Sequence, residues 1–259
     1  MNQEENIRQI HVHRLMEKGL KGYNTKIGVV NSGMGHDMFA GENVIGEIDF
    51  TGEGPYDLIG HGAIITRILH SIAPEAKMIS AKVVGANAQA NDYDVIRGIQ
   101  YCLSFDVDLI NISLGVLSAC EGSCYLCGAA EEAVKRGVVV VAAVGNYGTQ
   151  GTCCPANAPE VISVGSIEGN NPPGYSSRGK VTVLAPGALA IGEYRYIGTS
   201  MATPYVTASL ALIFSHLKPD VGILLETLKE SATDLGLACD TQGSGLFNAY
   251  QLYKKLGGR

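Results

Sequence analysis

The sequence predicts an α/β fold of three layers, in which a mostly parallel central sheet carries helices on both faces. Short β-branched runs, typical of buried strands, alternate along the chain with longer amphipathic runs, typical of helices. Strands that alternate with helices form parallel sheets, because each helix returns the chain to the same edge of the sheet. The length of 259 residues suits one large domain or two small ones, and no repeat, low-complexity tract or linker divides it. We therefore predict a single domain over residues 1–259.

The predicted elements are read from hydrophobic periodicity. Strands are expected at residues 26–30, 78–84, 107–113, 138–144, 161–164 and 181–184. Helices are expected at residues 62–72, 93–103, 129–136, 205–217 and 224–232. Residues 205–217 are apolar nearly all round, which indicates a buried helix. Pro204 is expected in its first turn, where a missing N–H costs little.

Composition and charge narrow the class of protein. The net charge is −6 and no basic run is present, which argues against a nucleic-acid partner. No apolar stretch is long and uncharged enough to span a bilayer. Residues 1–22 are polar and charged, without a signal-peptide core, which favours a cytoplasmic protein. The alternative is an exported protein whose targeting and pro-segments are absent from this sequence. Nothing in the sequence indicates the oligomeric state.

Four polar residues stand where predicted strands end or predicted helices begin. Asn31 ends the first strand and His61 opens the first long helix. Asn146 follows the strongest strand, and Ser200 precedes the apolar helix. In open parallel sheets, functional groups gather at the loops beyond the carboxyl ends of the strands. Taken singly, each residue also has a simple structural explanation as a turn residue, a cap or a loop start.

Together these stretches resemble the subtilisin-like serine proteases. Residues 198–204 are similar to that family's nucleophile motif, and residues 60–62 to its catalytic-histidine motif. Residues 139–146 resemble the strand and turn that carry the oxyanion asparagine, and residues 111–115 resemble the strand that pairs with substrate. The resemblance runs from about residue 7 to residue 253 in the family's order, so it is specific for the fold.

The resemblance implies acyl transfer through a serine. Ser200 would be the nucleophile, and His61 would take its proton and return it to the leaving amine. The side chain of Asn146 and the backbone N–H of Ser200 would donate to the oxyanion. Loss of one such donor typically raises the barrier by about 3–4 kcal/mol.

The resemblance also implies three sets of substrate-binding residues. An extended substrate would add as a strand beside Ser113, Leu114 and Gly115. The pocket for the side chain before the scissile bond would be lined by Ala143, Val144 and Gly145. The far end of the groove, where the family usually has glycines, reads Ala88, Gln89 and Ala90 and is expected to be narrower.

The implied partner is a peptide or protein substrate, bound in extended form, with no nucleic acid and no membrane. No cofactor is implied. The family often binds calcium, but no carboxylate cluster here matches its calcium loops, so no metal is predicted.

The position of the family's triad acid holds Asn31 instead of aspartate. An amide can hydrogen-bond to His61, but it carries no charge to stabilise an imidazolium and it can hold the wrong tautomer. A related substitution in a trypsin-like enzyme lowers the rate about 10⁴-fold, and loss of the subtilisin acid about 3 × 10⁴-fold. Asp37 and Asp49 lie away from the acid position, so neither is expected to replace it.

Two hypotheses follow from Asn31. The first is a serine endopeptidase of attenuated or specialised activity, for example one that trims a leader from a peptide product. The second is a pseudoprotease that binds peptides as a scaffold or regulator. An engineered aspartate-to-asparagine exchange would leave the same sequence.

Five cysteines gather near the expected groove. Cys120, Cys124 and Cys127 follow the substrate strand, and Cys153 and Cys154 follow the oxyanion turn. Both loops border the same pocket in the family fold, so the two groups can meet. Disulfides would suit an exported protein, a zinc site would need four thiolates or three with a histidine, and free thiols would suit a cytosolic protein. One or two disulfides are slightly favoured, and the chain's seven cysteines cannot all pair.

Overall fold

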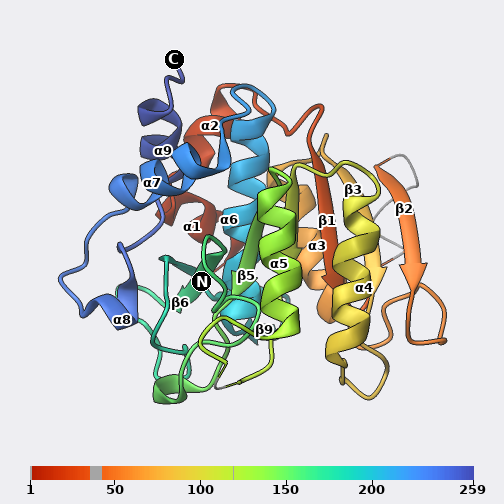
Figure 1. Ribbon diagram of the computed structural model, residues 1–259. Helices are drawn as coiled ribbons and strands as arrows, with labels where there is room; N and C mark the ends of the chain where they lie inside the picture. The colour runs from red at the N-terminus through yellow and green to blue at the C-terminus, as the bar shows by residue number, and fades with distance from the viewer. Residues whose placement is uncertain (1, 36–42, 119) are drawn as a thin grey trace.

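The computed structural model describes residues 2–35, 43–118 and 120–259. Within these residues a seven-stranded parallel sheet forms the centre of the fold, with helices packed around it (Figure 1). The strand order is β2-β3-β1-β4-β5-β6-β7, and every neighbouring pair is parallel. The strands are β1 (Lys26–Asn31), β2 (Val44–Asp49), β3 (Lys77–Lys82), β4 (Leu109–Ile112), β5 (Val139–Ala143), β6 (Ile162–Ile167) and β7 (Val183–Pro186). A separate antiparallel pair, β8 (Ala188–Ile191) and β9 (Tyr194–Ile197), leads into the longest helix.

Helices cover both faces of the sheet, which confirms the predicted three-layer α/β fold (Figure 1). One face carries α3 (His61–Ile72) and α6 (Thr199–Phe214), which pack on each other. The other face carries α4 (Asp92–Leu103) and α5 (Tyr125–Lys135), in front of the sheet in Figure 1. The remaining helices are α1 (Gln3–Gln9), α2 (His13–Glu17), α7 (Val221–Ser231), α8 (Cys239–Gln242), α9 (Ala249–Lys255) and the short 3₁₀ turn η2 (Gly148–Gln150).

The core divides along the pleat of the strands. In β1, Val29 packs into the core beneath α3 and α6, and its neighbour Val30 packs into the core beneath α4 and α5. Met78 and Ile79 of β3 divide in the same way. A strand buried on both faces must be apolar at successive positions, which explains the continuous β-branched runs of the sequence.

Several elements differ from the prediction. The apolar helix begins at Thr199 and not at residue 205, so Pro204 lies beyond the first turn and not within it. Helix α5 begins at Tyr125, four residues before its predicted start. Other elements without a predicted counterpart are α1, α2, α8, α9, β2 and the β8–β9 pair. No helix in the described ranges is both long and apolar enough to cross a membrane.

The strand order places a topological switch at β1. After β1 the chain forms β2 and then β3 on one side of it, and β4 follows on the other side. The carboxyl ends of β1 and β4 therefore open into loops that diverge, which leaves a crevice at this edge of the sheet. Asn31 is the last residue of β1, and Ser113 directly follows β4.

Candidate active site

A cavity of about 300 Å³ opens at this edge of the sheet. It brings together three of the four predicted catalytic residues, His61, Asn146 and Ser200. Ser113, Leu114 and Gly115 form part of the same wall, as predicted for the substrate strand. The other lining residues are Ile59, Val84, Ala88, Ala143, Gly145, Tyr147 and Thr199.

Ser200 is the second residue of α6 and the only residue of that helix that is not buried. The backbone N–H of Ser200 is among the four N-terminal amides that have no acceptor within the helix. The positive end of the helix dipole adds to the field of these amides. A hydroxyl and a free amide donor are therefore presented together at the cavity.

A buried chain of hydrogen bonds holds the backbone of Ser200 against β4. Pro204 has no N–H to donate to the Ser200 carbonyl one turn earlier, and the Ser113 hydroxyl donates to that carbonyl instead at 3.0 Å. Ser113 Oγ in turn accepts from Asn111 Nδ2 at 3.0 Å. Asn111 Oδ1 accepts from the hydroxyl of Thr207, about two turns after Ser200 in α6, at 2.9 Å. The hydroxyl of Ser113, directly after β4, thus supplies the hydrogen bond that Pro204 cannot make.

His61 is held by Asn31 through its inner ring nitrogen, with 2.7 Å between His61 Nδ1 and Asn31 Oδ1. The same oxygen accepts from the backbone N–H of Ser32 at 2.8 Å. A flipped amide would place NH₂ against this N–H, so the Ser32 backbone fixes the oxygen toward His61. His61 Nδ1 must then carry the proton, and Nε2 is left as the base. The amide Nδ2 of Asn31 is buried and has no hydrogen-bond partner among the residues that the structure describes.

The first turn of α3 is fixed from two sides. Ser32 Oγ accepts from the Gly62 N–H at 2.9 Å, directly after His61. A Cβ on Gly62 would lie 1.9 Å from the carbonyl oxygen of Gly33, so only glycine allows this approach. The glycine after His61 therefore lets the histidine helix rest directly on the loop that follows Asn31.

A carboxylate that the sequence analysis did not single out also acts on His61. Asp57 Oδ1 accepts from the N–H groups of Ile59 and Gly60, each at 3.1 Å, and Oδ2 accepts from Ala63 at 2.8 Å. Burial lowers the pKa of His61 below its ordinary value of 6.5, and the charge of Asp57 partly opposes this shift. Asp57 lies three residues before Gly60, the N-cap of α3, so no capping pattern in the sequence marks it.

The other acids considered from the sequence have different places. Asp49 accepts hydrogen bonds from Thr51 and Gly54 in its own loop. Asp37 lies outside the described residues.

Asn146 is oriented by Thr199. Its Oδ1 accepts from the Thr199 backbone N–H at 3.0 Å and from the Thr199 hydroxyl at 3.1 Å, so its NH₂ group is free to donate elsewhere. A Cβ placed on Gly198 would lie 3.1 Å from Asn146 Nδ2, and Gly198 has φ +138°. Gly198 is therefore needed both for its backbone conformation and for the space beside the amide. This geometry presents Asn146 Nδ2 as a fixed donor.

The predicted substrate residues divide into two groups. Ala88, Ala143 and Gly145 line the cavity, as expected. Val144, Gln89 and Ala90 are not among the described residues that line it. Val144 lies in a small core, Gln89 is exposed and Ala90 packs against the α4–α5 core. The role of these three in substrate binding stays a prediction.

Two features of the cavity wall were not predicted from the sequence. Ile59 and Tyr147 supply large apolar side chains that are partly exposed, and neither belongs to a periodic pattern. Ala88 adopts φ +58°, a left-handed conformation that favours glycine. The backbone at this end of the groove thus keeps a glycine-like shape although a methyl group is added.

All seven cysteines are free thiols, whereas the sequence favoured one or two disulfides. Cys120, Cys124, Cys127 and Cys154 meet, with their sulfur atoms within 4.8 Å of one another. Cys153 does not join them, because a Cβ on Gly145 would lie 2.3 Å from its sulfur, which places it behind the cavity wall. Burial raises the pKa of the Cys153 thiol to about 11, so it is protonated at neutral pH.

A hydroxyl, an imidazole and preplaced amide donors on one cavity form the arrangement that serine-dependent acyl transfer requires. Comparison with known proteins gives the same class: a family model described as the subtilase family matches residues 25–245. The chain belongs to the subtilase family and is a subtilisin-like serine protease.

Two curated relatives and two solved structures show the extent of the likeness. Subtilisin E of Bacillus subtilis (strain 168) is 33% identical over 267 aligned residues, which cover 93% of this chain and 69% of that protein. The major intracellular serine protease of the same organism is 32% identical over 242 residues, 82% of this chain and 75% of that protein. The prenylagaramide maturation protease PagA superposes with a TM-score of 0.76 at 23% identity, over 96% of this chain and 99% of PagA. A mutant of the protease domain of PatA superposes with a TM-score of 0.77 at 25% identity, over 92% of this chain and 97% of that chain.

Proposed function

We propose that this protein is a subtilisin-like endopeptidase whose hydrolysis is attenuated, and specialised for peptide processing, because Asn31 stands in the place of the triad acid. The observation that carries the proposal is the 2.7 Å contact between His61 Nδ1 and the uncharged Asn31 Oδ1. The amide selects the productive tautomer of His61 but supplies no negative charge. Attenuation is therefore an electrostatic effect, with the geometry left in place.

The reaction proceeds through an acyl-enzyme. Ser200 Oγ attacks the scissile carbonyl while His61 Nε2 takes the hydroxyl proton. Asn146 Nδ2 and the Ser200 N–H donate to the oxyanion, and His61 then returns the proton to the leaving amine. The imidazolium formed in the first step faces an amide dipole at Asn31 and not a carboxylate. The transition state of this step therefore loses more electrostatic stabilisation than that of any other step.

The substrate is an extended peptide segment. Ser113, Leu114 and Gly115 give it a strand edge, and Ala143 and Gly145 bound the adjacent pocket. The structural neighbour named as a prenylagaramide maturation protease supports a processing role for a protein of this fold. A slow enzyme suits processing of one peptide product better than general digestion.

The test is the Asn31→Asp variant, assayed by hydrolysis of an activated peptide ester. We expect kcat to rise by about 10⁴-fold, the reverse of the known losses on removal of the triad acid. Asn24→Asp is the matched control, because it adds the same charge at an exposed turn away from the cavity. Ser200→Ala sets the background rate.

Fluorophosphonate labelling separates the protease from a peptide-binding pseudoprotease. Labelling of Ser200 in the natural chain, lost in His61→Ala, supports the attenuated enzyme. A chain that binds peptide but is labelled in neither the natural form nor the Asn31→Asp form would be a scaffold, and the proposal would fail.

A further inference from the structure

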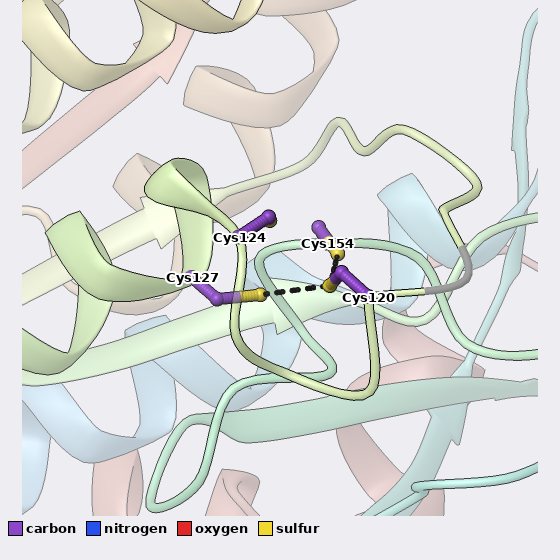
Figure 2. A group of neighbouring side chains, drawn as sticks. All are labelled: Cys120, Cys124, Cys127 and Cys154. Carbon is purple, nitrogen blue, oxygen red and sulfur yellow. Dashed lines mark hydrogen bonds between the residues drawn. The ribbon is translucent and has the colours of Figure 1, made fainter.

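Four cysteines from three separate segments meet below the substrate groove. Cys120 lies in the loop after β4, Cys124 is the N-cap of α5, Cys127 lies in the first turn of α5, and Cys154 lies in the loop after β5. Figure 2 shows the four side chains converging on a small shared space. All four sulfur atoms lie within 4.8 Å of one another.

The four sulfur atoms gather around one centre. Cys120 Sγ lies 2.9 Å from Cys154 Sγ and 3.9 Å from Cys127 Sγ (Figure 2). The sulfur atoms of Cys124 and Cys127 also lie within 4.8 Å of Cys154 Sγ. Two disulfides would need each sulfur to approach one partner at about 2.05 Å and to stay apart from the others. A sulfur atom that contacts more than one other sulfur is instead typical of thiolates that bind the same metal ion.

We propose that Cys120, Cys124, Cys127 and Cys154 bind one zinc ion as a tetrathiolate structural site. A Zn–S distance of about 2.3 Å places the sulfurs of a tetrahedron about 3.8 Å apart. The Cys120–Cys127 distance of 3.9 Å matches this edge, and the Cys120–Cys154 distance of 2.9 Å lengthens when zinc enters between the two sulfurs. Four thiolates fill a tetrahedral zinc ion completely and leave no position for water or substrate, so the site is structural. A cubane iron–sulfur cluster needs a wider ring of thiolates, because iron and sulfide ions separate them.

The surroundings suit a site with a net charge of −2. Lys180 is partly buried and close enough to Cys127 for their charges to interact. The Lys180 ammonium is held by the carbonyl oxygens of Ala156 and Val161, at 2.9 Å and 2.8 Å. The amino end of α5 also brings its positive dipole to Cys124 and Cys127. Each thiol releases its proton to solvent as zinc binds.

The zinc would clamp the two loops that carry the substrate groove. Val116 and Cys154 exchange backbone hydrogen bonds of 3.0 Å and 2.9 Å directly after the substrate strand. A Cβ on Gly115 would lie 2.8 Å from Cys153 Cβ, so the two loops touch at the groove itself. The metal would hold Gly115 and the loop behind Gly145 at a fixed separation. This consequence for the groove rests on the proposed function, whereas binding of zinc does not.

The first experiment measures zinc directly on the full chain, expressed with zinc and purified under reducing conditions. Elemental analysis is expected to find about one zinc per chain, lost in Cys120→Ser and in Cys154→Ser. Cys239→Ser is the matched control, because Cys239 is exposed and belongs to a different helix. Ser200→Ala must also keep its zinc, so a failure of the proposed function leaves this result unaffected.

A second experiment needs no cysteine variant. Cobalt exchanged into the natural chain is expected to give the strong sulfur-to-cobalt charge-transfer and red d–d bands of a tetrahedral thiolate site. Chelation of the zinc is expected to lower Tm. The proposal is overturned if the purified chain contains no metal and has four reactive thiols, or if the mass of the unreduced protein shows disulfides among the four cysteines. It is also overturned if iron and sulfide are found in place of zinc, or if chelation leaves Tm unchanged.

Discussion

The orientation of Asn146 by Thr199 leads to a prediction that a double-mutant cycle can test. Thr199→Val keeps the shape of the side chain but removes the hydroxyl that donates to Asn146 Oδ1 at 3.1 Å and accepts from the Gly145 N–H at 3.2 Å. The backbone N–H of Thr199 still holds the same oxygen at 3.0 Å. In this variant Asn146 Oδ1 therefore keeps one of the two hydrogen bonds that orient the amide.

The magnitude follows from the two kinds of contact. Removing the oxyanion donor itself, in Asn146→Ala, should lower kcat by about 10²- to 10³-fold. A neutral hydrogen bond contributes about 0.5–1.5 kcal/mol, so Thr199→Val should lower kcat by about 3- to 10-fold. In the double variant the effect of Thr199→Val should almost vanish, because Thr199 acts on the reaction through Asn146.

The assay is steady-state hydrolysis of a peptide ester by the four forms of the cycle, with Tm measured for each. Thr203→Val is a control, because its hydroxyl donates to the Thr199 carbonyl within α6 and does not touch Asn146. If Thr199→Val lowers kcat equally with and without Asn146, Thr199 does not act by orienting the amide and the account of this donor is wrong.

Three further predictions concern the supports of the site. Asp57→Asn should lower the pKa of His61 further, because the charge of Asp57 opposes the effect of burial. The acid limb of the pH profile of kcat/KM should then move to lower pH. An acid limb that moves to higher pH would contradict it. Ser113→Ala removes the partner of the buried Asn111 Nδ2 and of the partly buried Ser200 carbonyl, so the free energy of unfolding measured with denaturant should fall by about 2 kcal/mol. A fall below about 0.5 kcal/mol would refute the role of this hydrogen-bond chain. Gly198→Ala should lower kcat with little change in KM, because the added Cβ presses on Asn146 Nδ2, and an unchanged kcat would show that the amide is not confined.

The layers of the fold could be predicted because the sheet is buried on both faces. Such strands leave continuous β-branched runs, and their crossover helices leave one apolar face each. Strand β2 gave no such signal, since it lies at the edge of the sheet and is only half buried. Helix α1 is mostly polar and depends on a capping box between Asn2 and Glu5.

The residues on the cavity could be predicted as far as they belong to motifs. The role of Ser32 could not, because it depends on the direction of a backbone N–H at Asn31 Oδ1. Pro204 was placed in the wrong turn, since an apolar pattern does not show where a helix begins when its first residues are small.

The cysteines show a similar limit. Adjacent residues of an extended segment point to opposite sides, so Cys153 faces the cavity wall while Cys154 joins the cluster. Their spacing in the sequence alone does not show which of the two reaches Cys120.

The central claim is that Asn31 holds His61 in the productive tautomer without stabilising its charge. The most direct measurement is the pH titration of the His61 ring nitrogens by ¹⁵N NMR, in the natural chain and in Asn31→Asp. Burial and a neutral partner should give an Nδ1–H tautomer with a pKa below 6.5 in the natural chain. The carboxylate of Asn31→Asp favours the imidazolium, so the pKa should rise in that variant. An Nε2–H tautomer in the natural chain, or a pKa that Asn31→Asp leaves unchanged or lowers, would contradict the account.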